Sequence, residues 1–262
     1  MERQSRRVSA VGCREVIGLD RHHTLAQAVP VHAGGPVVDL GCGSGRTLVA
    51  LRERLGPQVE LVGVDRRDAS LVESLRTDSR FRMVLGDLNE TLPFADASFE
   101  AAVCHNTLEC LPDKPAFLRE VARVLVPGGH LLLSHTDFDT IVFNASDSVL
   151  TRRLVHVFAD TQEAWMDASD GMLGRKLVAV SRASPFALVD ILAWVCLDTD
   201  FAPEGAAHVA VQGIAGAARR GRHEELVSQL DAWIDDLRAL ADRGEFLYSV
   251  NAYAVVLHKP TE

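Results

Sequence analysis

Hydrophobic and polar residues follow two alternating patterns between residues 36 and 134. Short apolar runs predict buried strands at 36–40, 59–64, 81–85, 99–104 and 130–134. Between these runs, apolar residues recur at three- and four-residue spacing, which predicts helices at 46–55, 69–76 and 114–125. Strands that alternate with helices form a parallel sheet with right-handed crossovers, so this region is predicted to be α/β with helices on both faces of the sheet.

The pattern is less regular on either side of this region. Residues 15–29 predict one or two short helices, and residues 1–35 are interpreted as an N-terminal helical lid segment. Later patterns predict helices at 147–166, 209–218 and 224–242 and strands at 186–197 and 248–257. Adding these strands to the sheet predicts one doubly wound, Rossmann-like domain over 36–262. Its sheet has seven mostly parallel strands, with a helical cap insertion at about 136–185, after the fifth strand.

A glycine-rich turn follows the first predicted strand and carries the clearest chemical signal. It reads DLGCGSGR over residues 39–46, and its alternating glycines let a ligand approach bare backbone. The helix that starts after it offers free N–H groups. Asp65 ends the next strand, where a carboxylate can accept hydrogen bonds from both hydroxyls of a ribose. Together they predict a nucleotide-like ligand at the carboxyl ends of the strands.

Two such ligands compete, a nicotinamide dinucleotide and S-adenosylmethionine. The dinucleotide fingerprint G-x-G-x-x-G fails because Arg46 occupies its last position. Asp39 precedes the turn, and its carboxylate would repel a pyrophosphate but attract the cationic amino-acid end of a sulfonium compound. The local charge therefore favours S-adenosylmethionine.

Several stretches, taken together, resemble the class I S-adenosylmethionine-dependent methyltransferases. They are DLGCGSGR at 39–46, VGVDRR at 62–67, VLGDLNETLPFADASFE at 84–100, LREVARVLVPGGHLLLS at 118–134 and SVNAYAVVLHKP at 249–260. The resemblance is dense from 36 to 134 and looser afterwards. It implies the Rossmann-like fold, S-adenosyl-L-methionine as cofactor and S-adenosyl-L-homocysteine as its product.

The resemblance also implies which residues bind the cofactor. They are Asp39, Gly41, Cys42, Gly43, Gly45, Asp65, Arg66, Asp87, Leu88 and His105. The glycines would line the methionine part, and Asp39 would orient the turn or meet the amino group through water. Asp65 would bind the ribose hydroxyls, with Arg66 beside the adenine. Asp87 would accept from the adenine amine, with the Leu88 backbone against the ring, and His105 would lie under the methionine moiety.

Catalysis requires an aligned acceptor, exclusion of water and, for some acceptors, removal of a proton. His135 is the preferred general base, because a neutral imidazole titrates in the useful range, and Glu109 is the second candidate. Relatives that act on small natural products carry a His-His pair where this chain has Glu109-Cys110, so the base stays open. His105 and Glu109 form only a pair, so no metal site is expected.

The predicted insertion contains Phe138, Phe143, Phe158 and Trp165, which suit the cover of a pocket for a small, mostly apolar acceptor. O- or N-methylation is favoured, with C-methylation left open. The formal charge of −9, from 27 basic and 36 acidic residues, argues against a nucleic-acid partner. An RNA or protein methyltransferase and a non-catalytic, cofactor-binding regulatory protein are the alternatives.

The cysteines and the apolar runs indicate the cellular compartment in which the protein is expected. The five cysteines are scattered and include no C-x-x-C pair, which argues against a disulfide framework or a zinc site. The sequence shows no signal-peptide core and no apolar run long enough to cross a bilayer. These features predict a cytoplasmic monomer or homodimer without a membrane partner.

Overall fold

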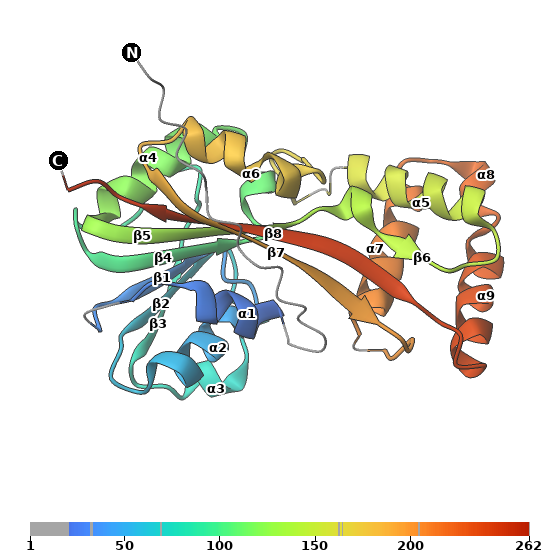
Figure 1. Ribbon diagram of the computed structural model, residues 1–262, viewed down its shortest axis with the longest axis horizontal. Coiled ribbons are helices and arrows are strands. Elements are labelled where there is room, and N and C mark those ends of the chain that lie inside the picture. The colour runs from blue at the N-terminus through green and yellow to red at the C-terminus, as the bar shows by residue number, and fades with distance from the viewer. Residues whose placement is uncertain are drawn as a thin grey trace, which may run out of the picture.

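The computed structural model describes residues 21–31, 34–68, 70–161, 163, 165–203 and 205–261. They form one mixed, eight-stranded sheet in the order β3-β2-β1-β4-β5-β8-β6, and β7 pairs with the other edge of β8 (Figure 1). The strands are β1 (Val37–Leu40), β2 (Leu61–Asp65), β3 (Phe81–Leu85), β4 (Phe99–His105), β5 (Leu125–Thr136), β6 (Val142–Phe143), β7 (Ala187–Asp198) and β8 (Tyr248–His258). The α-helices are α1 (Arg21–Ala28), α2 (Arg46–Leu55), α3 (Glu73–Arg76), α4 (Lys114–Val124), α5 (Ser148–Asp160), α6 (Leu173–Arg182), α7 (Ala206–Arg220), α8 (Glu224–Val227) and α9 (Leu230–Asp242). Two 3₁₀ turns, η1 (Leu108–Cys110) and η2 (Phe138–Thr140), complete the elements.

The first five strands are parallel, and β8 runs antiparallel to β5, β6 and β7. The predicted Rossmann-like fold is therefore confirmed. The eighth strand arises because β8 continues past the end of β5, and its first residues pair with the two-residue β6. Consecutive βαβ units bring the carboxyl ends of the parallel strands to one edge of the sheet, where ligands bind in such folds.

Helices cover both faces of the sheet. Figure 1 shows α4 and α6 above the sheet and α1, α2 and α3 below it. On the upper side, Phe117 and Val121 of α4 pack with Leu131 and Leu133 of β5 in one apolar core. On the lower side, a second core contains residues of α1, α2 and β1. β1 lies between the two cores and is buried along its whole length, which explains why its sequence is a nearly continuous apolar run.

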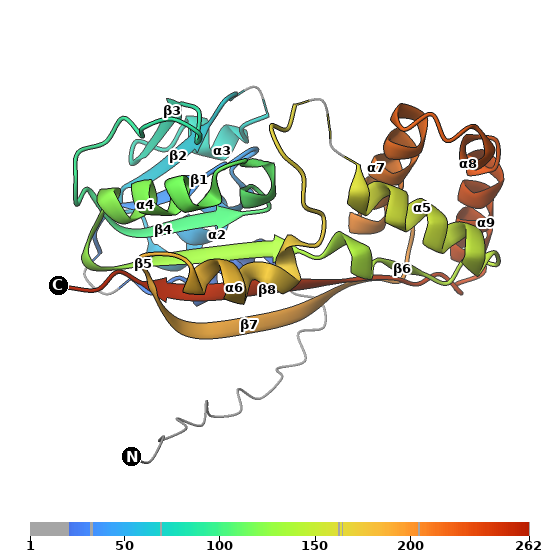
Figure 2. The same cartoon turned by 90° about the horizontal axis from the view of Figure 1, so that it is seen from above.

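A third apolar core lies at the far end of β7 and β8. It is built by β6, α5, α7, α8 and α9, which we call the outer lobe. Trp233 and Leu237 of α9 and Phe143 of β6 are among its buried residues. Both views show the outer lobe beyond the carboxyl ends of the parallel strands (Figures 1 and 2). The predicted insertion thus supplies β6 and α5 to the outer lobe, whereas α7, α8 and α9 come from the connection between β7 and β8.

The single helix predicted over 224–242 is wrong, because the chain turns at Ser228-Gln229 between α8 and α9. The Glu225 carbonyl accepts hydrogen bonds from the Ser228 hydroxyl (2.8 Å) and the Gln229 side-chain amide (3.0 Å). The backbone N–H of Gln229 bonds instead to the Leu226 carbonyl. Side chains that compete for a helical carbonyl in this way interrupt the helix.

The helix predicted over 69–76 is shorter than expected and spans only Glu73–Arg76. The Val72 N–H donates to the Ser44 carbonyl of the glycine-rich turn, so it does not enter a helical ladder. Ala69, Cys13 and residues 15–20 of the predicted N-terminal helices lie outside the described residues. Among the described residues, no helix combines the length and the apolar character needed to cross a bilayer.

Candidate active site

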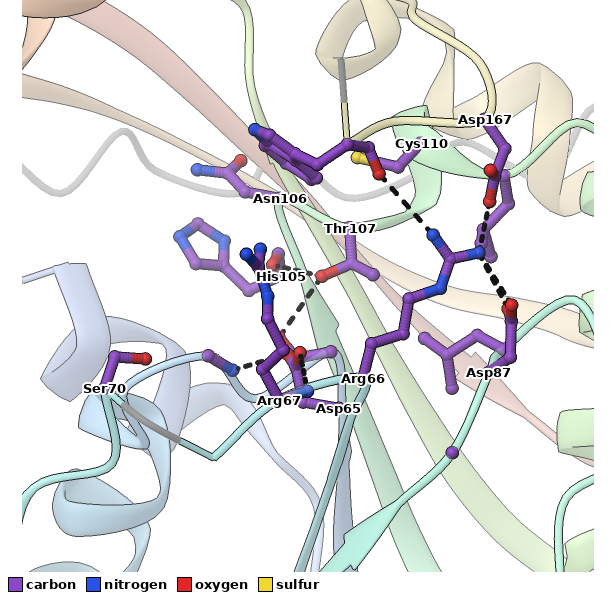
Figure 3. Close-up of a pocket in the computed structure, with 16 residues that line it drawn as sticks. Asp65, Arg66, Arg67, Ser70, Asp87, His105, Asn106, Thr107, Cys110 and Asp167 are labelled. Atoms are coloured by element: carbon purple, nitrogen blue, oxygen red, sulfur yellow. Dashed lines mark hydrogen bonds and ion pairs between the residues drawn. The ribbon is translucent and has the colours of Figure 1, made fainter. Parts of the chain in front are cut away.

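A cavity of about 690 Å³ opens at the carboxyl ends of β1 to β4. Figure 3 shows the residues that line it, which come from the glycine-rich turn, the loops after β2, β3 and β4, and the segment before α6. They are Gly41, Gly43, Asp65, Arg66, Arg67, Ser70, Gly86, Asp87, Leu88, His105, Asn106, Thr107, Cys110, Leu111, Trp165 and Asp167. Apart from the glycines and Asp39, the residues predicted to bind the cofactor are Cys42, Asp65, Arg66, Asp87, Leu88 and His105. All of these except Cys42 line the cavity.

The glycine-rich turn presents bare backbone to this cavity. Gly41 has φ +81°, and a Cβ atom there would lie 2.3 Å from the Thr107 hydroxyl oxygen. Gly43 has φ +52°, lines the cavity and has open space where a Cβ would stand. Side chains other than glycine are strained in this left-handed conformation. Gly41 therefore allows close packing against the loop after β4, whereas Gly43 leaves space on the cavity side.

Asp65 is held at the end of β2 by the backbone around it. One carboxylate oxygen accepts from the Gly43 N–H at 2.9 Å, and the other accepts from the Arg67 N–H at 3.3 Å. Each carboxylate oxygen can accept more than one hydrogen bond, so both keep acceptor capacity toward the cavity. The sequence-based pairing of this acid with the glycine turn is thus a direct contact in the structure.

Arg66 joins the loop after β3 to the segment before α6. Its guanidinium donates to both oxygens of Asp87 (3.0 and 2.8 Å) and to Asp167, as Figure 3 shows. Asn89 adds bonds from its backbone and side chain to Asp87 and from its side chain to Asp167. Partial burial works to raise the pKa of Asp87, but the bonds from Asn89 and Arg66 outweigh it and lower the pKa. Asp87 is therefore ionised at neutral pH.

Asp39 lies behind the turn and is 2% exposed. Burial, followed by the negative charge of Asp65, raises the pKa of Asp39 to about 7. Asp39, Cys42 and Gly45 are not among the residues that line the cavity. Any contact of Asp39 with a ligand would pass through the turn or through water.

His105 ends β4 and lines the cavity. Its Nδ1 lies 3.2 Å from the Ser134 hydroxyl, while its buried Nε2 has no hydrogen-bond partner among the described residues. Burial, with the nearby charges of Arg21, His22 and His135, lowers the pKa of His105 well below its usual value. The ring is therefore neutral, and an unpartnered buried nitrogen in a cavity wall is suited to a bound molecule.

The two predicted catalytic residues lie together but away from the cavity. His135 is 0% exposed and Glu109 is 4% exposed, and His135 Nε2 lies 3.4 Å from a Glu109 carboxylate oxygen. The Nδ1 of His135 is 2.5 Å from the Thr136 carbonyl oxygen. Neither residue is in the cavity lining, so the structure gives no contact through which either would take a proton from an acceptor. Their catalytic role stays a prediction against which this burial argues.

Sequence reasoning missed several residues of the cavity wall. Thr107 lies two residues after β4, so its place near the strand end could have singled it out. Asp167 comes from the distant insertion, and no local pattern marks it. Of the aromatic residues predicted to cover the pocket, Trp165 lines the cavity, whereas Phe138, Phe143 and Phe158 do not. Within the described part of the chain, His, Cys, Asp and Glu side chains form no group of three or more suited to hold a metal ion. Cys42, Cys104 and Cys110 are buried free thiols.

Comparison with known proteins adds to this geometry. A family described as a methyltransferase domain matches residues 31–189, more than half of the chain. The methyltransferase GfsG of Streptomyces halstedii is 32% identical over 130 residues, covering 48% of this chain and 45% of that protein. An uncharacterized 37.1 kDa protein in transposon TN4556 of Streptomyces fradiae is 26% identical over 235 residues, covering 88% of this chain and 65% of that protein. The chain thus spans less than two thirds of the length of these curated relatives.

The solved structure of the YcgJ protein from Bacillus subtilis has the same fold. It superposes with a TM-score of 0.58 at 22% sequence identity, covering 91% of this chain and 99% of that one. The agreement extends over nearly the whole chain, including segments beyond the family match.

Proposed function

Since the chain belongs to the methyltransferase-domain family, we propose that it transfers a methyl group from S-adenosylmethionine to a small, mostly apolar metabolite or natural product. O- or N-methylation is favoured, and C-methylation is left open. The observation that carries the proposal is the cavity at the strand ends, which joins Gly43, Asp65 and Asp87 in one wall. Its volume of about 690 Å³ lies within the usual range for small-molecule sites.

The residues present fit the cofactor on their own chemistry. Gly43 offers bare backbone with open space, where the methionine part would lie. Asp65 has acceptor capacity for the ribose hydroxyls. Asp87 would accept from the adenine amine, sharing its carboxylate with Arg66 and Asn89. The unpartnered Nε2 of His105 suits a polar atom of the methionine part.

When bound, S-adenosylmethionine supplies an activated methyl group on a cationic sulfur. The acids that line the cavity, Asp65, Asp87 and Asp167, outnumber its arginines, Arg66 and Arg67, so the charge of the lining favours such a cation. The described wall after β4 supplies His105, Asn106, Thr107, Cys110 and Leu111, of which His105 is neutral. A strong general base is not among these groups, so the chain would act mainly by aligning the acceptor and excluding water.

Calorimetric titration of the purified protein with S-adenosylmethionine and S-adenosylhomocysteine tests the proposal. We expect both to bind. The second step is incubation of the protein with methyl-labelled cofactor and a metabolite extract, followed by mass spectrometry to identify the labelled product. Absence of binding in both titrations would reject the cofactor assignment. Binding without transfer to any acceptor would favour a regulatory protein, and label in RNA or protein would reject the small-molecule acceptor.

A further inference from the structure

Trp165 differs from the other tryptophans of the chain. Its side chain is 53% exposed and lines the cavity, whereas Trp194 and Trp233 are 8% and 3% exposed in apolar cores. Leaving a large apolar side chain in water forgoes the stabilisation that burial provides. The indole makes no hydrogen bond or ring contact with another described residue, so its face is available to a molecule in the cavity.

The chain is anchored at Trp165 and in the three residues that follow it. The Trp165 carbonyl accepts from Arg66 at 3.5 Å, and the next residue but one, Asp167, binds Arg66 and Asn89. The Ala168 N–H donates to the Cys110 carbonyl at 3.1 Å, which ties the segment to the turn after β4. These bonds hold the indole at the cavity in a defined place.

The wall that follows β4 is uncharged. It presents Asn106, Thr107, Cys110 and Leu111 to the cavity, while the acid within this segment, Glu109, is buried against His135. The charged cavity residues come instead from the loops after β2 and β3 and from Asp167. Desolvating an ionised molecule against the uncharged wall would be costly, so the wall selects neutral ligands.

Asn106 provides a polar group of fixed orientation within this wall. Its Oδ1 accepts from the Thr136 N–H at 2.8 Å, and its Nδ2 donates to the Thr136 hydroxyl at 3.2 Å. A carboxamide has two donor hydrogens and two lone pairs, so one of each remains. Asn106 also has φ +49°, a left-handed conformation that places it at the cavity wall directly after the strand.

We infer that Trp165, Asn106, Cys110 and Leu111 form an acceptor subsite for a neutral molecule with a flat ring, which lies against the indole and hydrogen-bonds to Asn106. This inference rests on the proposed function and narrows its acceptor class. Aromatic faces attract flat rings beyond the effect of buried area alone. Trp165 is then a specificity-determining residue.

The test uses matched probes and calorimetry on protein saturated with S-adenosylhomocysteine. The probes are 2-naphthol, its saturated analogue decahydro-2-naphthol, and the anion 2-naphthoate. We expect 2-naphthol to bind at least about five-fold more tightly than either of the others. Trp165→Ala should weaken the binding of 2-naphthol by at least about five-fold. Trp165→Phe keeps an aromatic face and should retain most of the wild-type affinity for 2-naphthol.

The matched control is Val195→Ala on β7, which removes an exposed apolar side chain away from the cavity and should leave 2-naphthol affinity unchanged. Equal binding of 2-naphthol and its saturated analogue, no binding of 2-naphthol to the wild type, or full affinity in Trp165→Ala would overturn the subsite. The two proposals fail separately. If the wild type does not bind S-adenosylhomocysteine, the cofactor assignment is rejected. The comparison of wild type with Trp165→Ala in cofactor-free protein then still tests whether the acceptor subsite exists.

Discussion

The cavity edge of the sheet is lined partly by charged residues, whereas the outer lobe is built around an apolar core. At the cavity edge, β1 contains the buried acid Asp39, whose pKa is raised, β2 ends at Asp65, and Asp87 follows β3. In the outer lobe, Trp233 and Phe143 stack edge to face in an apolar core, and the Trp233 indole N–H donates to Thr151 at 3.0 Å. The cavity edge therefore holds a buried acid that costs stability, whereas the lobe supplies packing. Changes at the two places should affect different measurements.

The largest effect is expected in the lobe. Trp233→Ala removes a buried indole and should lower the free energy of unfolding by about 3–5 kcal/mol. The affinity for S-adenosylhomocysteine should stay the same, because Trp233 does not line the cavity. Urea denaturation and calorimetry measure the two quantities, with Trp233→Phe as a milder control. A parallel loss of affinity would show that the lobe and the cavity edge are coupled.

Asp39→Asn tests the cost of a buried acid at the cavity edge. The folded chain holds a proton on Asp39 up to about pH 7, whereas the unfolded chain releases it near its ordinary pKa of 3.8. The contribution of Asp39 to the free energy of unfolding of the wild type is therefore fully present below pH 3.8 and is lost as the pH rises to about 7. The difference in free energy of unfolding between Asp39→Asn and wild type should therefore shift in favour of the variant by roughly 2–4 kcal/mol from acidic to mildly alkaline pH. Urea denaturation across this range measures it, and a constant difference would contradict the raised pKa.

Asp65→Ala should act on binding. Loss of charged hydrogen bonds to the ribose should weaken S-adenosylmethionine binding by roughly 1–3 kcal/mol, measured by calorimetry. The control is Asp68→Ala, an exposed acid nearby that does not line the cavity. An unchanged dissociation constant for Asp65→Ala would show that the acid at the end of β2 does not contact the cofactor.

The smallest effect is expected at the link between the two regions. Asp167→Asn breaks a half-exposed ion pair with Arg66 but leaves the Arg66–Asp87 pair, so cofactor affinity should fall by less than about 1 kcal/mol and the loss should shrink in high salt. Glu163→Gln is the matched control, because it removes an ion pair with Arg220 of the outer lobe from the same segment. An effect as large as that of Asp65→Ala would make this segment part of the binding site proper.

Prediction from sequence succeeded where neighbours along the chain decide the structure. The strand at 81–85 was predicted with its observed bounds, because a short apolar run between polar turns has few alternatives. The contact between Asp65 and the glycine-rich turn followed from two adjacent parallel strands. The complete burial of His135 could not be predicted in this way, because it depends on neighbouring elements, and its catalytic role stays a prediction.

Local sequence patterns were enough to predict the parallel sheet, the glycine-rich turn and the acids in β1, at the end of β2 and after β3, because strand periodicity, glycine conformation and strand-end position are local properties. The packing of α5 with α7 to α9 in one lobe, and the contacts of Trp165 and Asp167 with the loops after β2 and β3, emerge only in three dimensions. The physical reason is that these contacts join segments far apart in the chain, whose packing depends on the shape of both partners. Periodicity indicates whether a side chain is buried or exposed, but it does not indicate which residues the side chain packs against.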